Sequence, residues 1–511
     1  MGFSSLAKYK IPIIFCLFLL FLYLASRLLT ISQLPLFTDE AIYVRWAQIA
    51  KNDANWRFIS LTDGKQPLFI WFVIVAMKFI NDPLVAARVV SVFAGIGTSI
   101  GLFFVTRQLF RNYWIGIISA SLYVIYSFAL VYDRMALYDG LVGTFFIWGL
   151  YMAILLVRTR RLDVALIAGM VNGAATLNKT PGFFNIYLLP VSILLLNLRT
   201  KNERMRTLVK WAGLAMLVAV MTYGIYSLLR LSPFFHIITQ KNALFVYPFS
   251  QWIQHPFQSF FGNLFAGLQD WFFRYMTISF AVLIIWAFFI DKKFLKEKLL
   301  LFLWFFIPFI ALAFFGNRLY PRYIFFMTLP LLPLIAYTLI ALKERIQNKI
   351  LFSIVVTLGL FLQLHSSFLV LFNFPYATIP YSDVSQYNND WPSGTGIKES
   401  VAFFEQQAQD QTIFVATQGT FGLMPYAYEI YLGEHPNVEI KGYWPIGKNV
   451  PSEVVATSEK MPTYFVFYQG CAPCPAAGLA PLSWGNATPV LQIPKFAPNV
   501  YLSVYQISPG K

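Results

Sequence analysis

The chain has 511 residues, of which 58% are hydrophobic and only 12% are charged. A typical soluble domain carries about 25% charged residues, so this chain could not cover several soluble domains with polar surface. The composition and the mean hydropathy of +0.60 exclude a soluble enzyme, a secreted disulfide scaffold and a disordered chain. The apolar runs are continuous rather than alternating, which excludes a transmembrane β-barrel and predicts an α-helical polytopic membrane protein.

The charge is unevenly distributed along the chain. The segment after residue 372 has six Lys, no Arg and ten Asp or Glu, a net charge of −4, whereas the part before it carries +20. A basic membrane part followed by an acidic tail indicates segments on two sides of a membrane, and it argues against binding to nucleic acid.

The apolar runs predict eleven membrane spans. The first follows Lys8 and Lys10, is too long for a signal-peptide core and lacks a small-residue cleavage site, so we expect it to be retained. An additional run, 68–80, has only 13 residues, which is short for a span. The eleven predicted spans are 11–29, 88–106, 115–132, 140–157, 163–178, 183–198, 209–229, 276–290, 299–315, 323–342 and 350–372.

The positions of the basic loops indicate on which side of the membrane each loop lies. If 68–80 does not cross, every basic loop falls on the same side as Lys8 and Lys10, as the positive-inside rule requires. We therefore expect a multi-pass protein of the cell (plasma or inner) membrane, with a cytoplasmic N-terminus and 68–80 as a juxtamembrane or re-entrant element. The basic loops are 107–111, 158–161, 199–210, 291–298 and 343–349.

This threading defines two domains. Residues 1–372 form the transmembrane domain, whose first outer loop, 32–87, contains juxtamembrane helices. The aromatic outer loop 231–275 is expected to lie on the membrane surface. Residues 373–511 form an extracytoplasmic soluble α/β domain, long enough to hold its own core. In this tail the patterns predict helices at 396–409 and 421–432, and strands at 412–417, 438–443, 464–468 and 501–507.

Acidic residues follow the first span closely. The first outer loop reads L-F-T-D-E-A and places Asp39 and Glu40 at the expected start of a helix. One interpretation is structural: Thr38 caps the helix and the two carboxylates favour its dipole. The other is that one carboxylate is a general base at the membrane surface. The two interpretations are compatible.

The other outer turns carry cations. Lys65 precedes the short apolar run in T-D-G-K-Q-P, and Arg134 and Asp139 lie in the turn Y-D-R-M-A-L-Y-D-G. A snorkelling lysine and a structural ion pair in a tight turn are the plain interpretations. Together, however, these residues form a rim of cations around a few carboxylates, which suits an anionic, lipid-linked phosphate. The rim is completed by Lys179, Arg318 and Arg322.

These motifs carry a family resemblance. The acidic D-E-A of the first outer loop, the K-Q-P before an apolar stretch and the R-x-x-x-x-D turn resemble the GT-C superfamily of polyprenyl-phosphate-sugar-dependent glycosyltransferases, in particular the protein O-mannosyltransferase, aminoarabinose transferase and RgtA-D-like group. The resemblance covers about residues 1–345. One departure is G-K-Q-P where the group commonly has K-P-P, which weakens the case for Lys65. The tail resembles no characterised module.

The resemblance implies an activity and roles for the residues. It implies a GT-C catalytic domain that moves a sugar from a polyprenyl-phosphate donor to an acceptor hydroxyl on the outer face, with inversion. Asp39 would be the catalytic carboxylate, with Glu40 as the alternative base, and Asp139 the second acid. Lys65 and Arg134 would contact the donor phosphate, with Arg322, Lys179 and Arg318 as further phosphate candidates. The acceptor is left open between a protein, a cell-wall glycan and a lipid, and membrane lipids are expected partners.

Two other functions use a similar cationic rim. A non-enzymatic carrier or flippase for a polyprenyl-linked sugar would need polar groups at mid-membrane, whereas the spans here are nearly free of charge. A glycan ligase would depend on paired Arg and a His in an outer loop, which His236 and His255 leave open.

Metal and redox signals are weak. The four His are far apart and show no ligand spacing, so no metal site is predicted, although assistance by a divalent metal is left open. Cys471 and Cys474 form C-A-P-C in the tail, where a local structural disulfide is favoured over a redox role. We expect the tail to serve acceptor recognition or stability rather than catalysis.

Overall fold

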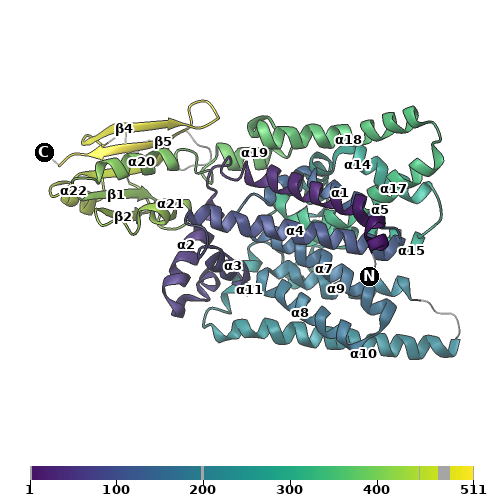
Figure 1. Cartoon of the computed structure of the whole chain (residues 1–511). Helices are drawn as coiled ribbons and strands as arrows, with labels where there is room; N and C mark the ends of the chain where they lie inside the picture. The colour runs from purple at the N-terminus through teal and green to yellow at the C-terminus, as the bar shows by residue number, and fades with distance from the viewer. Residues whose placement is uncertain (1–2, 197–200, 448, 470–483, 510–511) are drawn as a thin grey trace. The chain divides into compact units, whose positions relative to one another are not determined.

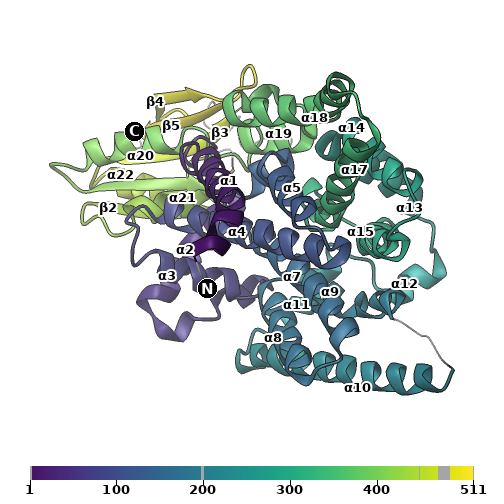
Figure 2. The same ribbon diagram turned by 45° about the vertical axis from the view of Figure 1, so that its right-hand side comes forward.

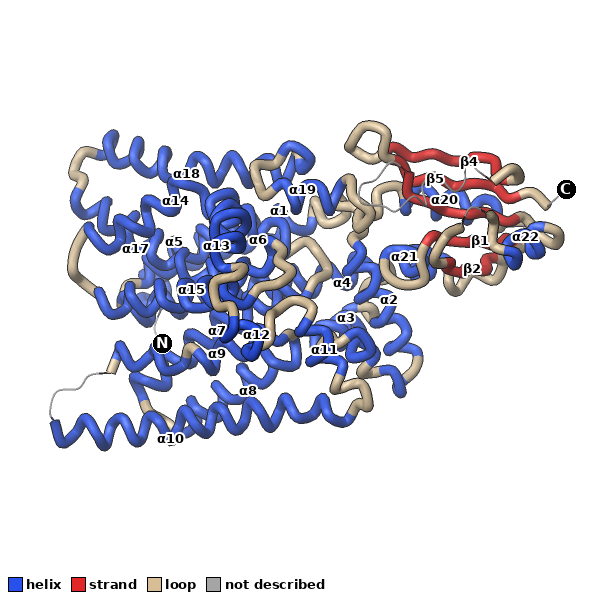
Figure 3. The backbone as a smooth tube through the Cα atoms, turned by 180° about the vertical axis from the view of Figure 1, so that it is seen from behind, coloured by secondary structure: helices blue, strands red, loops and turns tan. Residues whose placement is uncertain are grey.

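The computed structural model describes residues 3–196, 201–447, 449–469 and 484–509. The chain divides into two compact units. Unit 1 comprises residues 1–30, 57–72 and 88–380, and it is helical (Figure 1). Unit 2 comprises residues 31–56, 73–87 and 381–511, and it contains the five-stranded sheet (Figure 3). Cys471 and Cys474 lie outside the described residues.

The helices of unit 1 follow the predicted apolar runs. Among the described residues, seven helices are long and apolar enough to cross a membrane, and four shorter apolar helices lie between them. The fold class, a polytopic helical protein with a small C-terminal sheet domain, is therefore confirmed, while the number of spans stays a prediction. The main helices that follow the apolar runs, spanning or shorter, are α1 (Phe3–Leu28), α4 (Pro83–Phe110), α7 (Tyr138–Thr159), α8 (Leu162–Asn178), α10 (Lys201–Tyr226), α14 (Gln269–Phe289), α15 (Leu295–Phe315), α17 (Leu332–Arg345) and α18 (Lys349–Phe372).

Two predicted spans are interrupted where prolines fall. The run 183–198 is built of η3 (Thr180–Phe183), α9 (Phe184–Tyr187) and η4 (Leu189–Leu195), and 323–342 begins with η7 (Pro321–Ile324), α16 (Phe325–Thr328) and η8 (Leu329–Leu331). Pro190 and Pro330 lack the N–H that a continuous helix needs, so the chain changes to short 3₁₀ turns there. The short run 68–80 forms α3 (Leu68–Ala76), which has nine residues and is too short to span.

The predicted span 115–132 is broken for a different reason. It forms α5 (Tyr113–Val124) and α6 (Ser127–Tyr132), separated by Ile125 and Tyr126. The carbonyl of Val124 accepts from Arg27 Nη1 at 2.7 Å, and the carbonyl of Ile125 accepts from the Ser367 hydroxyl. These side chains satisfy the carbonyls that a helix end leaves without partners, so the break is stable in an apolar environment.

Helices α8 and α10 lie side by side in every view of unit 1 (Figures 1 and 2). A Cβ atom added at Gly169 would lie 2.7 Å from Met221 Cβ, and one at Gly173 would lie 2.4 Å from Ile225 Cδ1. The two glycines therefore allow a close approach of the backbones, as is usual for helices that pack in a membrane.

Segment 231–275, which the sequence predicts to be an outer loop, contains short helices with exposed apolar side chains. They are α11 (Ile237–Ala243), α12 (Phe249–Gln254) and α13 (Phe260–Asn263). Phe249, Phe257 and Phe261 are all exposed. Such a surface suits the predicted position at the membrane interface.

Unit 2 has a mixed sheet with strand order β2-β1-β3-β5-β4. Strand β1 is fully buried and pairs in parallel with β2 and β3, while β5 is antiparallel to β3 and β4. The predicted helices and strands of the tail are present. They are α20 (Ile397–Gln407), β1 (Ile413–Gln418), α21 (Leu423–Leu432), β2 (Val438–Tyr443), β3 (Thr463–Gln469) and β5 (Tyr501–Ile507).

Three elements of this unit were not predicted. They are α19 (Tyr381–Asn388), α22 (Ser452–Ser458) and β4 (Ala487–Pro494). Strand β4 contains Pro489 and a register irregularity beside it, so it lacks the alternation of a regular strand. Proline is tolerated there because β4 is an edge strand.

The core of unit 2 lies on both faces of the sheet. On one face Phe414, Phe465 and Phe467 pack with Val454 of α22 and with Trp484. On the other, the ring of Phe404 from α20 lies 5.7 Å from Tyr428 of α21 and 5.6 Å from Tyr464 of β3. The period-2 pattern of the strands supplies both sets of side chains.

Candidate active site

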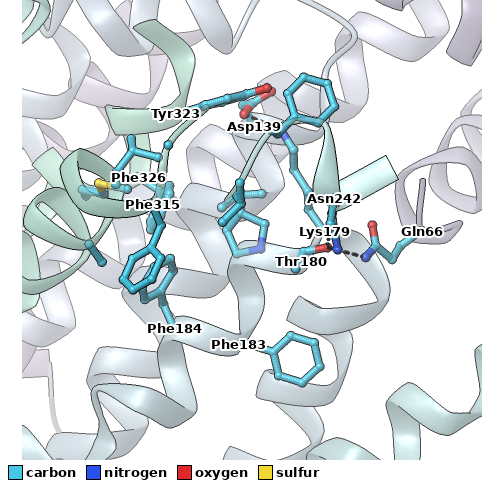
Figure 4. Close-up of a pocket in the computed structure, with 18 of the residues that line it drawn as sticks. Gln66, Asp139, Lys179, Thr180, Phe183, Phe184, Asn242, Phe315, Tyr323 and Phe326 are labelled. Atoms are coloured by element: carbon cyan, nitrogen blue, oxygen red, sulfur yellow. Dashed lines mark hydrogen bonds and ion pairs between the residues drawn. The ribbon is translucent and has the colours of Figure 1, made fainter. Parts of the chain in front are cut away.

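A pocket of about 440 Å³ lies within unit 1. In Figure 4 the polar side chains Gln66, Lys179, Thr180 and Asn242 gather on one side, and Phe184, Phe315 and Phe326 lie on the other. The pocket is lined by Gly64, Lys65, Gln66, Asp139, Val142, Lys179, Thr180, Pro181, Phe183, Phe184, Tyr187, Lys241, Asn242, Phe245, Val246, Ala311, Leu312, Phe315, Gly316, Tyr323, Phe326 and Met327.

Asp139 and Lys179 form an ion pair in this pocket. Asp139 is the second residue of α7, where the helix dipole favours a carboxylate. Lys179 directly follows α8, and its Nζ donates to Asp139 Oδ1 at 2.8 Å. Pro181 begins the next turn and prevents α8 from continuing, so the lysine is presented at the helix end.

Lys65 reaches the pocket from the first outer loop. Gly64 ends η2 (Ile59–Asp63) with a φ of +68°, and a Cβ atom there would lie 2.6 Å from Lys241 Cβ. Glycine is therefore required both by the left-handed backbone and by the close approach of α11. The Lys65 amino group lies 5.5 Å from the centroid of the Phe245 ring, a cation–π distance.

Lys241 is a pocket cation that the sequence analysis missed. It lies in the last turn of α11, and its Nζ donates to Asp63 Oδ1. The loop 231–275 reads as an aromatic surface segment, so a lysine within it carries no distinguishing pattern. Only the packing of α11 against η2 brings Lys241 beside Gly64 and Lys65.

Next to these lysines, three polar side chains form a hydrogen-bond network. Gln66 is buried and donates from Nε2 to Thr180 Oγ1 at 2.9 Å, while Thr180 Oγ1 lies 3.4 Å from both Oδ1 and Nδ2 of Asn242. These contacts connect the link before α3, the turn after α8 and helix α11. Three segments distant in sequence are thus held around one polar end of the pocket.

The rest of the lining is apolar. Phe183, Phe184 and Tyr187 come from η3 and α9, Phe315 ends α15, and Phe326 belongs to α16. A cavity with amino groups at one end and aromatic side chains at the other can hold an anionic head group attached to an apolar chain.

The two acidic residues of the first outer loop lie in unit 2 and have different environments. Both are on the first turn of α2 (Thr38–Asn52). Glu40 is fully buried, and its Oε2 accepts from the backbone N–H of Phe37 at 3.0 Å. It therefore acts as a helix cap. Asp39 is only half-buried, and its catalytic role stays a prediction.

The arginines predicted to bind phosphate are not among the lining residues. Arg134 is fully buried and donates to the carbonyl of Leu130 at 2.6 Å and to that of Val370 at 3.0 Å. Arg318 is exposed on the turn after α15. The Arg322 guanidinium lies 6.0 Å from the ring centroid of the lining residue Tyr323. The structure thus brings Lys65, Asp139 and Lys179 together, while the phosphate-binding roles of the arginines stay predictions.

Beside Arg134 lies a buried ion pair that the sequence analysis did not identify. Arg27 Nη2 lies 3.4 Å from Asp133 Oδ2, and both side chains are fully buried. The hydroxyls of Tyr23 and Tyr123 donate to the same carboxylate at 3.0 and 2.8 Å. The apolar surroundings require such complete pairing, and the network joins α1 to the turn after α6.

Among the described residues, no group of three or more His, Cys, Asp or Glu could hold a metal ion.

Comparison with known family models finds one match, to part of the chain. Residues 64–226 match the family model described as dolichyl-phosphate-mannose-protein mannosyltransferase. This segment includes Lys65, Asp139 and Lys179. No curated protein sequence matches the chain significantly.

Solved structures resemble the chain over most of its length. ArnT from Cupriavidus metallidurans in the apo state has 12% sequence identity and a TM-score of 0.57, with 98% of each chain covered. ArnT from the same organism bound to undecaprenyl phosphate has 14% identity and a TM-score of 0.54, with 98% of each chain covered. The apo oligosaccharyltransferase from Archaeoglobus fulgidus has 13% identity and a TM-score of 0.51, with 91% of this chain and 70% of that chain covered. The chain therefore shares the overall fold of these solved structures, and residues 64–226 are similar to the mannosyltransferase family model.

Proposed function

We propose that this protein transfers a sugar from a polyprenyl-phosphate donor to an acceptor hydroxyl on the outer face of the cell membrane, with inversion at the anomeric carbon. The observation that carries the proposal is the pocket that joins Lys65, Lys179 and Lys241 to an aromatic interior. A lipid phosphate has the same division into an anionic head and an apolar chain. The match of residues 64–226 to a mannosyltransferase family and the resemblance to an ArnT bound to undecaprenyl phosphate support it.

The lysines supply the electrostatic part of the reaction. When the bond between the anomeric carbon and the phosphate oxygen breaks, the electron pair stays on the phosphate, which leaves with an additional negative charge. One cation 4 Å away stabilises a unit charge by roughly 4 kcal/mol at an effective dielectric constant of 20. Fixed amino groups provide this stabilisation without reorganisation of water during the reaction. Asp139 would hold Lys179 in place for this purpose.

The acceptor requires a general base, for which we propose Asp39. The acceptor hydroxyl attacks the anomeric carbon from the side opposite to the phosphate and loses its proton to the Asp39 carboxylate. The new carbon–oxygen bond replaces the bond to the phosphate, so the configuration inverts. Proton transfer to a positioned carboxylate contributes typically 10²–10⁴-fold to the rate.

The donor sugar and the acceptor define the remaining specificity. We propose a hexose or pentose as the sugar, and a protein hydroxyl, a cell-envelope glycan or a lipid as the acceptor. The N-terminus is proposed to be cytoplasmic, with the sheet domain outside.

Donor turnover tests the proposal. Purified protein in lipid nanodiscs is incubated with a panel of polyprenyl-phosphate hexoses and pentoses together with acceptor peptides, glycans and lipids. We expect free polyprenyl phosphate to appear with at least one donor and to increase when its acceptor is added. A carrier would bind a donor without releasing polyprenyl phosphate. Binding without release across the panel would contradict the enzyme assignment.

A further inference from the structure

Helix α2, which carries Asp39, belongs to the same compact unit as the C-terminal sheet domain. Residues 31–56 are separated from residues 381–511 by more than 300 positions in the sequence, yet they form one unit. Two sets of contacts join them, at the start and in the middle of α2.

The start of α2 is bonded to the turn 389–394. The backbone N–H of Thr38 donates to the Pro392 carbonyl at 2.9 Å, and the N–H of Gly394 donates to the Leu36 carbonyl at 2.7 Å. The Phe37 ring meets the Tyr387 ring edge-on, with centroids 4.9 Å apart. Because Asp39 directly follows this segment, its backbone position is set by the turn.

The turn is itself held by the sheet. Lys495, the residue after β4, is buried and donates from Nζ to the carbonyl of Asp390 at 3.0 Å and to that of Ser393 at 2.9 Å. Its amino group also lies 4.4 Å from the centroid of the Tyr468 ring on β3. A continuous series of bonds therefore connects the sheet to the residue before Asp39.

The middle of α2 is bonded to α21. Arg45 Nε donates to Glu429 Oε2 at 2.7 Å, and both side chains are about three-quarters buried. One turn further along, Gln48 Nε2 donates to the Ile430 carbonyl at 3.0 Å. The buried ring of Trp46 packs near Phe421, which precedes α21.

We infer that the C-terminal domain positions Asp39, and that Arg45 and Glu429 are positioning residues for the proposed base. This inference depends on the function proposed above. A helix moves as a rigid rod, and Arg45 lies six residues, or about 9 Å, from Asp39 along it. Attachment at both points fixes the tilt of the rod and its rotation. A base displaced by about 1 Å can cost on the order of 10²-fold in rate, so a small change in tilt is sufficient to slow the reaction. On this inference the tail has an indirect part in catalysis, which differs from the expectation from the sequence that it serves acceptor recognition or stability.

The experiment compares two ion pairs in the full-length protein. Glu429→Gln removes the pair with Arg45, and Glu453→Gln is the matched control, because Glu453 pairs with Lys441 at 2.6 Å on the exposed surface of the same domain. We expect Glu429→Gln to lower kcat about tenfold, with donor KM, donor binding and melting temperature nearly unchanged. The control should retain wild-type kcat. The charge-swapped variant Arg45→Glu/Glu429→Arg should recover most of the lost kcat.

Three results would overturn the inference. The first is an unchanged kcat in Glu429→Gln, and the second is an equal loss of kcat in the control Glu453→Gln. The third is a loss of kcat in Glu429→Gln that accompanies loss of folding and is not recovered by the charge-swapped variant. The proposed function fails separately, if no donor is turned over or if Asp39→Asn is fully active. A protein that needs Asp39 but tolerates Glu429→Gln would retain the proposed function and refute the positioning role.

Discussion

Asp39 and Glu40 are neighbours with the same charge, but the structure gives them different environments. Glu40 is buried and caps α2 through the Phe37 N–H, whereas Asp39 is half-buried. A carboxylate that caps a helix is already engaged by a backbone donor, while a base must reach a substrate. The assignment of Asp39 as the base can therefore be tested against its neighbour.

Asp39→Asn should leave folding and donor binding nearly intact, because Asn is close in shape and is also accepted in the first turn of a helix. It should reduce turnover by 10²–10⁴-fold through loss of the general base. Glu40→Gln should remain close to wild type, since a Gln carbonyl can still accept from the Phe37 N–H. Measurements of turnover and melting temperature for both variants show which carboxylate is the general base. Full activity of Asp39→Asn would show that Asp39 is not the base. If Glu40→Gln lost more turnover than Asp39→Asn, the base would be Glu40.

Lys241 provides a second prediction at this scale. Lys241→Ala should weaken donor binding by about tenfold or more, as expected when a charge-assisted contact of about 1.5–3 kcal/mol is lost. Lys241→Arg keeps the charge and should lose much less. Lipid-phosphate affinity, measured with polyprenyl phosphate alone, reports this directly. Equal affinities for Lys241→Ala and the wild type would show that Lys241 does not contact the phosphate.

At the scale of elements, the polar end of the pocket is formed by the ends of helices and the turns beside them. Gly64 turns the chain at the end of η2, Lys179 follows the end of α8, and Lys241 lies in the last turn of α11. Helix ends leave polar backbone groups exposed and direct side chains away from the helix body. Residues for binding an anion are therefore concentrated at these ends, while the helices between them supply the apolar wall.

Lys495, which binds the turn 389–394, should make the stability of the folded protein depend on pH. Burial lowers the pKa of Lys495 to about 7, far below its usual value of about 10.4, although Asp390 opposes the shift. Between these values the unfolded chain binds more protons than the folded one, so stability should rise as pH increases above 7. The neutral amine still has two N–H groups, enough for the Asp390 and Ser393 carbonyls.

We expect the melting temperature of full-length protein to increase from pH 6.5 to 9 through Lys495, equivalent to about 2–3 kcal/mol of stability. Lys495→Met should lose this increase, whereas the exposed Lys460→Met, as a control, should retain it. Identical pH profiles for Lys495→Met and the wild type would show that Lys495 keeps an ordinary pKa.

At the scale of the whole molecule, charge predicts the sidedness of the chain. Basic loops should be cytoplasmic and the acidic tail external. In a cysteine-free background, Lys460→Cys should be labelled from outside intact cells by a membrane-impermeant reagent, and Arg345→Cys should be labelled only after the cells are opened. Labelling of position 345 from outside would refute the threading, and it would mean that 68–80 crosses the membrane.

Much of this protein could be predicted from the sequence because the relevant signals are local. Apolar runs of membrane length predict helices, and short runs of β-branched and aromatic residues predict β1, β2, β3 and β5. The outer turns with Lys65, Asp139 and Lys179 could be identified because charge is rare beside apolar spans. The edge strand β4 was missed because Pro489 disturbs its pattern.

The tertiary structure decided which distant residues are partners. It buried Arg134 against the Val370 carbonyl, placed Lys241 beside Gly64, and joined α2 to the C-terminal sheet through Arg45 and Glu429. Nothing in the local sequence around any of these residues indicates which distant segment it contacts. Hydropathy and charge specify how a segment interacts with water and lipid, which is a property of that segment alone. Pairing between segments depends on geometry, because a hydrogen bond or ion pair forms only when the complete fold brings its two halves within about 3 Å.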